Sequence, residues 1–494
     1  MSKSCNVLLI YPPHRDKVSA SEVPPLGMAY LASFVRKQMG DACILSIWDL
    51  NINRISQQQF KEQLRSFDKK PDIIGIGGIV TVFRHFLWIS KICKEIFPDA
   101  LLIAGGSLAS TASHLLFKHS PVDVCVKGEG EFTFLEIIQK AAQGSGREGL
   151  RNVNGVFLWD VDRQEVIATP ARKASFDLDI FGMPAYDLLD MGKYVTDFSG
   201  YSRDLPAEIR AAENQHMPIM TSRGCTDRCT FCYRQFAAIR MNSASFVKKH
   251  ILYLHEHFGV NVFSFIDELF NISEKRINEL CDCFMELKNK IPNFYFRAEG
   301  RADIINIAML KRLKEAGCFQ IIYGLESGSP KMLQLMKKRL TVEQNRLAVL
   351  AAKDAGLHCV PQFLIGLPGE TRETLAETIK FIESIDLWSY VCIHKANAYP
   401  GSDIYRYALE HGLIRDECAY VSSLADSASY PLQLGKISQK EMMAMVRKYL
   451  IKRQARLIFR SHNVMTGIIL FIAWLFINIS RKLKTAKAKR SVRA

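Results

Sequence analysis

The chain has 494 residues, of which 48% are hydrophobic and 23% are charged, a composition that excludes disorder, collagen and coiled coil for the chain as a whole. Lys and Arg outnumber Asp and Glu by 65 to 50, but eleven basic residues and no acidic ones lie in 451–494. The remainder is close to neutral, which argues against a nucleic-acid-binding core. Thirteen cysteines, an odd number, and a start without a signal-like apolar segment predict a reducing, cytoplasmic location.

Residues 1–142 alternate between short apolar runs and amphipathic stretches, which predicts a parallel sheet built from β-α-β units. Helices are expected near 26–38 and 83–96, and strands at 7–10, 43–48, 73–80, 100–104 and 122–126. Glycines stand at the ends of the last three strands. Because ligands of parallel sheets bind at the carboxyl ends of the strands, we expect a binding site there.

Residues 143–215 are expected to form a connecting region with two strand-like pieces, at 155–159 and 165–168. A second β/α series occupies 216–413 and predicts a partial (βα)6 barrel, with functional residues just after its strands. Its strands are expected at 217–220, 262–266, 294–298, 319–323, 360–365 and 390–396. The predicted fold class is α/β: a Rossmann-like parallel sheet, then the partial barrel, then a helical region over 414–463 and a tail over 464–494.

The strongest chemical signal is the pattern C-x3-C-x2-C, formed by Cys225, Cys229 and Cys232 directly after the first barrel strand. Thiolates are soft ligands that suit iron–sulfur clusters. Three cysteines on a cubane cluster leave one iron without a protein ligand, so that iron can bind a substrate or cofactor. A three-cysteine zinc site is the alternative, but no nearby His or Cys offers a fourth ligand at conventional spacing.

This cysteine pattern resembles that of the radical S-adenosylmethionine superfamily. Its members hold a [4Fe–4S] cluster that binds S-adenosylmethionine and cleaves it to a 5′-deoxyadenosyl radical. The resemblance implies that S-adenosylmethionine is contacted by residues in the cysteine loop and after later barrel strands. They are Phe231, Asp267, Glu268, Arg301, Glu326, Ser327, Ile365 and Gly366. Each of these taken alone also fits an ordinary turn or a helix N-terminus.

The N-terminal region resembles the cobalamin-binding domain of the cobalamin-dependent subgroup, which includes anaerobic tetrapyrrole cyclases and cobalamin-dependent methylases. The cobalt-ligating motif D-x-H-x-x-G is absent, and His14 lies near its place without fitting it. Relatives often carry a His where this chain has Leu108. A sheet kept only as a scaffold is the alternative. The residues implied to contact cobalamin are Pro12, Pro13, Leu26, Gly77, Gly78, Gly105, Gly106, Ser107, Gly128, Glu129 and Gly130.

Together the resemblances imply an enzyme that functionalises an unactivated carbon, with methyl transfer as the first hypothesis and oxidative cyclisation as the second. They imply a small-molecule or lipid substrate and a one-electron donor such as flavodoxin or ferredoxin. The sequence identifies no further catalytic residue. A non-catalytic iron–sulfur redox sensor is the rival of another class. Methylthiotransferases fit less well, because Cys5, Cys43, Cys93 and Cys125 lie apart instead of forming a second cluster motif.

Residues 464–479 form a run of 16 mostly apolar residues, flanked on both sides by Lys and Arg. As a helix this run spans about 24 Å, short of the roughly 30 Å of a bilayer core. A membrane-spanning orientation would also place basic residues on both sides, against the positive-inside rule. We therefore expect a helix that lies on the cytoplasmic membrane surface, with a buried helix and a spanning helix as alternatives.

Overall fold

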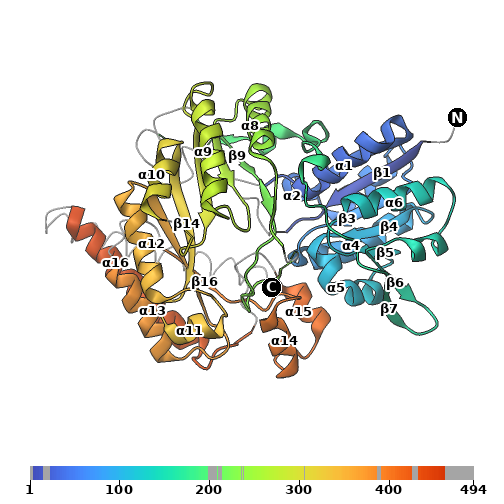
Figure 1. Ribbon diagram of the computed structural model, residues 1–494. Coiled ribbons are helices and arrows are strands. Elements are labelled where there is room, and N and C mark those ends of the chain that lie inside the picture. Colours follow the sequence, from blue (N-terminus) through green and yellow to red (C-terminus); the bar gives the residue numbers. More distant parts are fainter. Residues whose placement is uncertain are drawn as a thin grey trace.

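The computed structural model describes residues 4–14, 23–197, 209, 214–234, 236, 238–304, 306–385, 391–424 and 432–461. Two lobes lie side by side, the N-terminal sheet in blue to teal and the barrel in green to orange (Figure 1). The expected apolar helix at 464–479 and the basic tail lie outside the described residues. Over the part of the chain that is described, we find no helix of the length and apolarity needed to cross a membrane.

The N-terminal lobe is built on a seven-stranded sheet in the order β2-β1-β3-β4-β5-β6-β7. β1 and β3 to β5 are buried on both faces and accordingly consist mostly of apolar residues. The first five strands are parallel, whereas β6 and β7 add to the edge in antiparallel pairing. The strands are β1 (Cys5–Tyr11), β2 (Cys43–Asp49), β3 (Ile73–Gly77), β4 (Leu101–Gly105), β5 (Val124–Val126), β6 (Val156–Asp160) and β7 (Glu165–Ala168).

The order of these strands creates a topological switch point between β1 and β3. Strand order runs one way to β2 and the other way through β3, β4 and β5. Crossover helices therefore lie on both faces, and a crevice opens at the carboxyl ends of β1 and β3. The helices are α1 (Leu26–Met39), α2 (Leu50–Asn53), α3 (Gln57–Arg65), α4 (Phe83–Ile96), α5 (Gly106–His119) and α6 (Glu131–Ala142).

The second lobe is a curled sheet in the order β16-β15-β14-β13-β12-β9-β8. Its six strands from β9 to β16 are parallel, and the two-residue β8 (Thr196–Asp197) pairs antiparallel to β9 at the edge. A small hairpin of β10 (Ser222–Arg223) and β11 (Arg240–Met241) follows β9. The parallel strands are β9 (Gln215–Ile219), β12 (Val262–Phe265), β13 (Tyr295–Gly300), β14 (Cys318–Glu326), β15 (His358–Ile365) and β16 (Cys392–Lys395).

Helices cover the outer face of this sheet, and several start at side-chain caps. Thr341 and Thr371 close capping boxes at the starts of α12 and α13. The helices are α8 (Ala244–Phe258), α9 (Glu274–Lys288), α10 (Ile307–Glu315), α11 (Pro330–Leu335), α12 (Val342–Asp354) and α13 (Arg372–Ser384).

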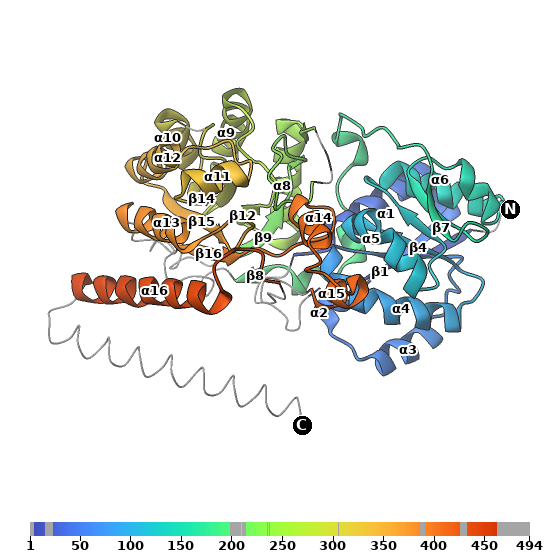
Figure 2. The same cartoon turned by 90° about the horizontal axis from the view of Figure 1, so that it is seen from below.

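The C-terminal helices connect the two lobes. α14 (Asp403–Glu410) and α15 (Glu417–Ser423) lie beside α4 and α5 of the N-terminal lobe, while α16 (Gln439–Ser461) runs along the barrel (Figure 2). Tyr405 and Val421 share a hydrophobic core with Ile76 of β3. On the opposite side, Tyr30 of α1 belongs to the core of the barrel. The two lobes are therefore joined by shared cores.

The predicted fold class is confirmed: a parallel N-terminal sheet is followed by a six-stranded partial barrel and C-terminal helices. Two details differ from expectation. The third strand ends at Gly77 instead of continuing to 80, because Val80–Val82 forms a 3-10 turn. The strand pieces in the connecting region are part of the first sheet. The domain boundaries at 142, 215, 413 and 463 stay predictions.

Candidate functional site

The three cysteines of the C-x3-C-x2-C pattern lie on the loop that follows β9 and the β10 strand. Cys225 and Cys229 are half-buried and Cys232 is exposed, whereas seven other cysteines are buried. Desolvation by the surrounding protein raises the pKa of Cys229 to about 11 and that of Cys232 to about 12, and the nearby Cys225 raises both pKa values further. Within the described ranges, no three His, Cys, Asp or Glu side chains converge closely enough to hold a single metal ion.

Asp227, inside the cysteine loop, anchors that loop to the barrel. Its side chain is buried and pairs with Arg301, just after β13, and with Arg339, whose Nη2 lies 2.6 Å from Oδ1. Burial alone would raise the pKa of Asp227, but the two guanidinium groups hold it below its usual value. The loop conformation is thus fixed by buried charge, before any cofactor binds.

Backbone contacts hold the other half of the loop. The Thr230 N–H donates to the Met336 carbonyl at 3.0 Å, and the Ile404 N–H of α14 donates to the Thr230 carbonyl at 3.0 Å. Gly224 has a φ of +93°, and a Cβ there would collide with the Ala238 carbonyl. A glycine is therefore required where the chain enters the loop.

Of the residues expected to contact S-adenosylmethionine, Arg301 and Glu326 lie beside the cysteine loop. Arg301 pairs with Asp227 as described. Glu326 lies 3.1 Å from Lys338 Nζ, and both charges act on the thiols of Cys229 and Cys232. Glu326 has a φ of +64°, a strained conformation for a residue other than glycine. Strain of this kind is common where a binding site fixes the backbone.

Asp267 and Ser327 are turned toward the protein interior. Asp267 accepts hydrogen bonds from the Thr221 N–H (2.7 Å) and the Ser222 hydroxyl (2.9 Å), which fixes the turn before the cysteine loop. Burial raises its pKa to about 6 although these donors oppose the shift. The Ser327 hydroxyl lies 2.8 Å from that of Thr378. The half-buried Phe231 packs against the hydrophobic core that the N-terminal lobe shares with α14 and α15.

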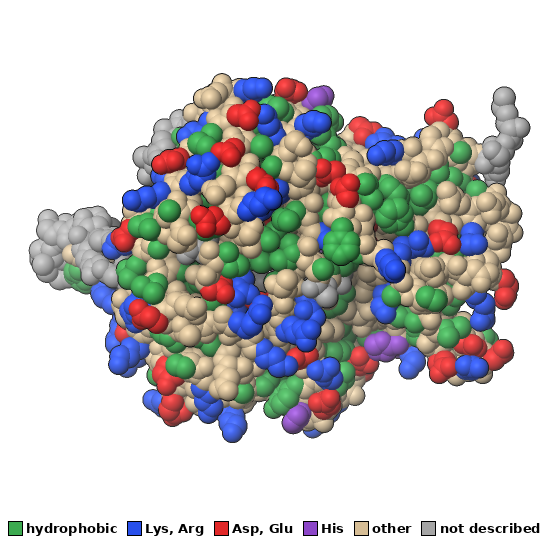
Figure 3. All heavy atoms as spheres, viewed as in Figure 1, with side chains coloured by type: hydrophobic (Ala, Val, Ile, Leu, Met, Phe, Trp, Pro, Cys, Tyr) green, Lys and Arg blue, Asp and Glu red, His purple; other side chains and the backbone are tan. Residues whose placement is uncertain are grey.

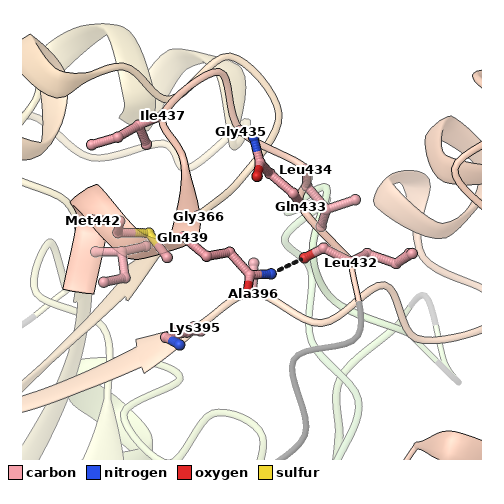
Figure 4. Close-up of a pocket in the computed structure, with 11 residues that line it drawn as sticks. Gly366, Lys395, Ala396, Leu432, Gln433, Leu434, Gly435, Ile437, Gln439 and Met442 are labelled. Carbon is pink, nitrogen blue, oxygen red and sulfur yellow. Dashed lines mark hydrogen bonds between the residues drawn. The ribbon is translucent and has the colours of Figure 1, made fainter.

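Ile365 and Gly366 border a small hollow of about 10 Å³ at the ends of β15 and β16 (Figure 4). Met442 of α16 lies against Gly366, and Gln439 Nε2 donates to the Leu432 carbonyl at 2.9 Å. The buried Glu370 accepts a hydrogen bond from the Gly366 N–H, and burial raises the pKa of Glu370 to about 7. The segment before α16 thus closes over the loop that follows β15.

A cavity with a volume of about 430 Å³ lies between the two lobes. One wall consists of the carboxyl ends of β1, β3 and β4, at the switch point of the N-terminal sheet. The other wall belongs to the barrel lobe. It contains Met220, Ser222, Arg223, Phe236, Ile266 and Glu268.

Nine of the eleven residues expected to contact cobalamin line this cavity, and Pro12 and Pro13, which are buried, do not. Glu268, expected to contact S-adenosylmethionine, lines it too, and burial raises the pKa of its carboxyl. A Cβ built on Gly105 or Gly128 meets no atom within 4 Å, so both glycines leave open space. Gly106 has a φ of +78°, and a Cβ there would lie 2.5 Å from the Gly78 carbonyl oxygen. The cavity wall therefore depends on glycine for space and for backbone approach.

A buried quartet of charged residues joins the two walls of the cavity. It consists of Arg223 and Arg240 of the β10–β11 hairpin, Glu129, which precedes α6, and Glu131, the first residue of α6. Arg223 Nη1 lies 2.9 Å from Glu129 and 2.7 Å from Glu131, and Arg240 Nη1 lies 2.6 Å from Glu129. Arg223 also stacks over the rings of Tyr30 and Phe181 at 5.2 and 5.1 Å. Burial opposes the charge of Arg223, but Glu131 and Glu129 hold its pKa above the ordinary value.

Sequence reasoning did not identify this quartet or the apolar residues of the barrel wall. Arg223 was visible beside the cysteine motif and Glu131 at the end of the glycine-rich run, but they lie 92 residues apart in the chain. The contact of the segment before α16 with the loop after β15 was also missed, because nothing in either segment signals the other.

The residues present fit both cofactors that the motifs imply. Three accessible thiols on one anchored loop provide the donor set of an iron–sulfur cluster with one iron left open. A large cavity whose glycines leave open space stands at the place where parallel sheets bind ligands.

Family models match most of both lobes. The radical SAM superfamily model matches residues 219–382 and the B12 binding domain model matches residues 17–138. The chain is 30% identical over 419 residues to an uncharacterized methyltransferase of Pyrococcus horikoshii, covering 83% of this chain and 85% of that protein. It is 29% identical over 381 residues to an anaerobic magnesium-protoporphyrin IX monomethyl ester cyclase of Rubrivivax gelatinosus, covering 76% and 65%.

Solved structures share the fold. The radical S-adenosylmethionine methyltransferase TsrM of Kitasatospora setae, with cobalamin and a [4Fe-4S] cluster bound, superposes with a TM-score of 0.63 at 16% identity and covers 83% of this chain and 76% of that one. The cobalamin-dependent enzyme OxsB has a TM-score of 0.63 at 21% identity and covers 91% and 62%. The chain belongs to the family of cobalamin-binding radical S-adenosylmethionine enzymes, and its cofactors are a [4Fe-4S] cluster, S-adenosylmethionine and cobalamin.

Proposed function

We propose that this enzyme transfers a methyl group to an unactivated carbon of a small organic substrate. The observation that carries the proposal is the cavity of about 430 Å³ with one wall from the cobalamin-binding sheet and the other from the loops beside the cysteines. A substrate in this cavity would lie between both cofactors. The arrangement suits a reaction in which one cofactor activates the carbon and the other delivers the group.

The chain's own residues have distinct proposed roles in this reaction. Cys225, Cys229 and Cys232 would hold the cluster, and Arg301 and Glu326 beside them would border the S-adenosylmethionine site. The glycines after β3, β4 and β5 would bring the backbone against cobalamin. When bound, the cluster supplies the electron that splits S-adenosylmethionine, and cobalamin supplies methyl-group transfer.

The cavity walls would protect the reaction from water. Met220, Phe236 and Ile266 line the barrel side, and most of the strand-end wall is apolar as well. A dry cavity prevents side reactions of a reactive carbon radical. The buried quartet around Arg223 would fix the distance between the walls, so that the substrate carbon meets both cofactors.

Two relatives favour methyl transfer and one favours the second candidate. The Pyrococcus horikoshii protein bears the name of a methyltransferase. A cytidylyl-2-hydroxyethylphosphonate methyltransferase of Streptomyces wedmorensis is 24% identical over 440 residues. The cyclase of Rubrivivax gelatinosus, at 29% identity, supports oxidative cyclisation as the alternative.

Product analysis with S-adenosylmethionine carrying a trideuterated methyl group tests the proposal. The enzyme is reconstituted anaerobically and incubated with a small-molecule extract of its source cells and a chemical reductant. Methyl transfer gives S-adenosylhomocysteine, 5′-deoxyadenosine and a product that bears the label. Formation of 5′-deoxyadenosine with an unlabelled, oxidised product would overturn methyl transfer in favour of cyclisation. The Cys229→Ala variant is the matched blank.

We also propose a cytoplasmic location and a protein electron donor. None of the thirteen cysteines forms a disulfide bond, which suits a reducing compartment. The reaction consumes electrons that the chain itself does not generate, so a one-electron carrier of the flavodoxin or ferredoxin type is the proposed partner.

A further inference from the structure

The outer side of the cysteine loop carries exposed positive charge. Between Cys225 and Cys229, Asp227 is buried whereas Arg228 is exposed, and no carboxylate of the described residues pairs with Arg228. Lys337, Arg339 and Arg406 flank the loop, with side chains 62%, 66% and 68% exposed. We name Arg228, Lys337, Arg339 and Arg406 the basic face.

The basic face is part of the immediate surroundings of the cysteines. Met336, next to Lys337, accepts the Thr230 N–H, and Ile404 of α14, two residues before Arg406, donates to the Thr230 carbonyl. Thr230 follows Cys229 directly. Figure 3 shows Lys and Arg side chains gathered on the face between α11 and α14. A protein bound there would lie against the loop that holds the cluster.

The carboxylates near the basic face do not neutralise it, because Asp227 and Asp403 each pair with two cations. Asp227 serves both Arg301 and Arg339 and is 5% exposed. Asp403, 39% exposed, lies 3.2 Å from Lys337 and 2.8 Å from Arg406. Glu410 stands 3.9 Å from Arg406. Asp227 and Asp403 are less exposed than the cations, and Glu410, 63% exposed, is the carboxylate among these three that matches them. Four cations therefore face one carboxylate of similar exposure, so the field that an approaching protein meets is positive.

We propose that the basic face is the docking surface for an acidic one-electron carrier protein. This inference rests on the proposed function, since only an enzyme that is reduced at this loop needs such a carrier. In the docked complex one electron leaves the carrier, which is oxidised by one equivalent, and the cluster is reduced by one equivalent; no bond or proton moves. Complementary charge speeds the encounter of the two proteins and orients the carrier on the loop.

The test compares a protein donor with a chemical one. The variant Lys337→Gln/Arg406→Gln removes two exposed charges of the basic face that lie outside the cysteine loop. Lys353→Gln, on exposed α12, is the matched control. The 5′-deoxyadenosine formed from S-adenosylmethionine is measured with dithionite and, separately, with reduced flavodoxin, whose binding is followed by calorimetry.

With dithionite, both variants are expected to match the wild type. With limiting flavodoxin, the double variant is expected to be about tenfold slower and to bind flavodoxin more weakly, and high salt should slow the wild type similarly. Unchanged flavodoxin binding and rate in the double variant would overturn the proposal. So would slower cleavage of S-adenosylmethionine by the double variant with dithionite, because the basic face would then act in the cleavage itself. No cleavage by wild type with dithionite would instead refute the proposed function.

Discussion

The buried quartet around Arg223 allows a stability prediction whose size follows from burial. The side chains of Arg223, Glu129 and Glu131 are 11%, 10% and 6% exposed. Arg223→Met keeps an apolar stem over Tyr30 but leaves Glu131 without an ion-pair partner among the described residues. Breaking a buried pair on one side costs about 3 to 5 kcal/mol. We expect the free energy of unfolding in urea to fall by that amount.

An exposed pair supplies the control. Arg36 lies 2.6 Å from Asp187, with side chains 38% and 59% exposed. Arg36→Met should therefore cost about 1 kcal/mol or less. Adding Glu131→Gln to Arg223→Met removes the unpaired charge and should restore part of the stability. Equal effects of Arg223→Met and Arg36→Met, or no recovery in the double variant, would refute this reasoning.

Three further predictions concern the cofactors and pH. Cys229→Ala should abolish the cluster and the cleavage of S-adenosylmethionine yet leave cobalamin bound, which iron content and absorption spectra would measure. Loss of both cofactors together would show that the lobes do not bind them separately. Gly106→Ala should weaken cobalamin binding and destabilise the protein by about 2 to 5 kcal/mol, because residue 106 has a left-handed backbone conformation and the new Cβ would collide with Gly78. Gly192→Ala, at an exposed and unstrained glycine, is the control and should do neither. Burial lowers the pKa of His250 to about 3. Below about pH 6.5 the imidazole of His250 is therefore protonated in the unfolded chain but not in the folded protein. The free energy of unfolding should fall by about 1.4 kcal/mol per pH unit as the pH drops toward about 3. His250→Gln should reduce that slope by one proton, and an unchanged slope in urea titrations would contradict the assignment.

Much of the fold was predictable because parallel strands have a clear signature. Runs such as Val7–Ile10 are apolar without alternation, and glycines mark the ends of the later strands β3, β4 and β5. The antiparallel addition of β6 and β7 was not predictable, because a two-stranded hairpin looks the same whichever edge it joins. The packing of α14 and α15 on the N-terminal lobe depends on contacts across hundreds of residues.

The candidate site was predictable at the level of loops, but not of side-chain direction. The sequence places Asp267 and Glu268 together after β12, yet Asp267 faces the protein interior and Glu268 faces the cavity. Neighbouring residues at a strand end point to opposite sides, and one sequence does not tell which side holds the ligand. The pairing of Arg223 with Glu131 likewise depends on the meeting of the lobes.

The electron paramagnetic resonance spectrum of the reduced, anaerobically reconstituted protein, recorded with and without S-adenosylmethionine, tests the central claim most directly. An open iron on a cluster held by Cys225, Cys229 and Cys232 predicts that S-adenosylmethionine changes the spectrum and is then cleaved to 5′-deoxyadenosine. A protein that contains zinc in place of iron would contradict the account. So would a cluster whose spectrum does not change when S-adenosylmethionine is added, with no cleavage of S-adenosylmethionine.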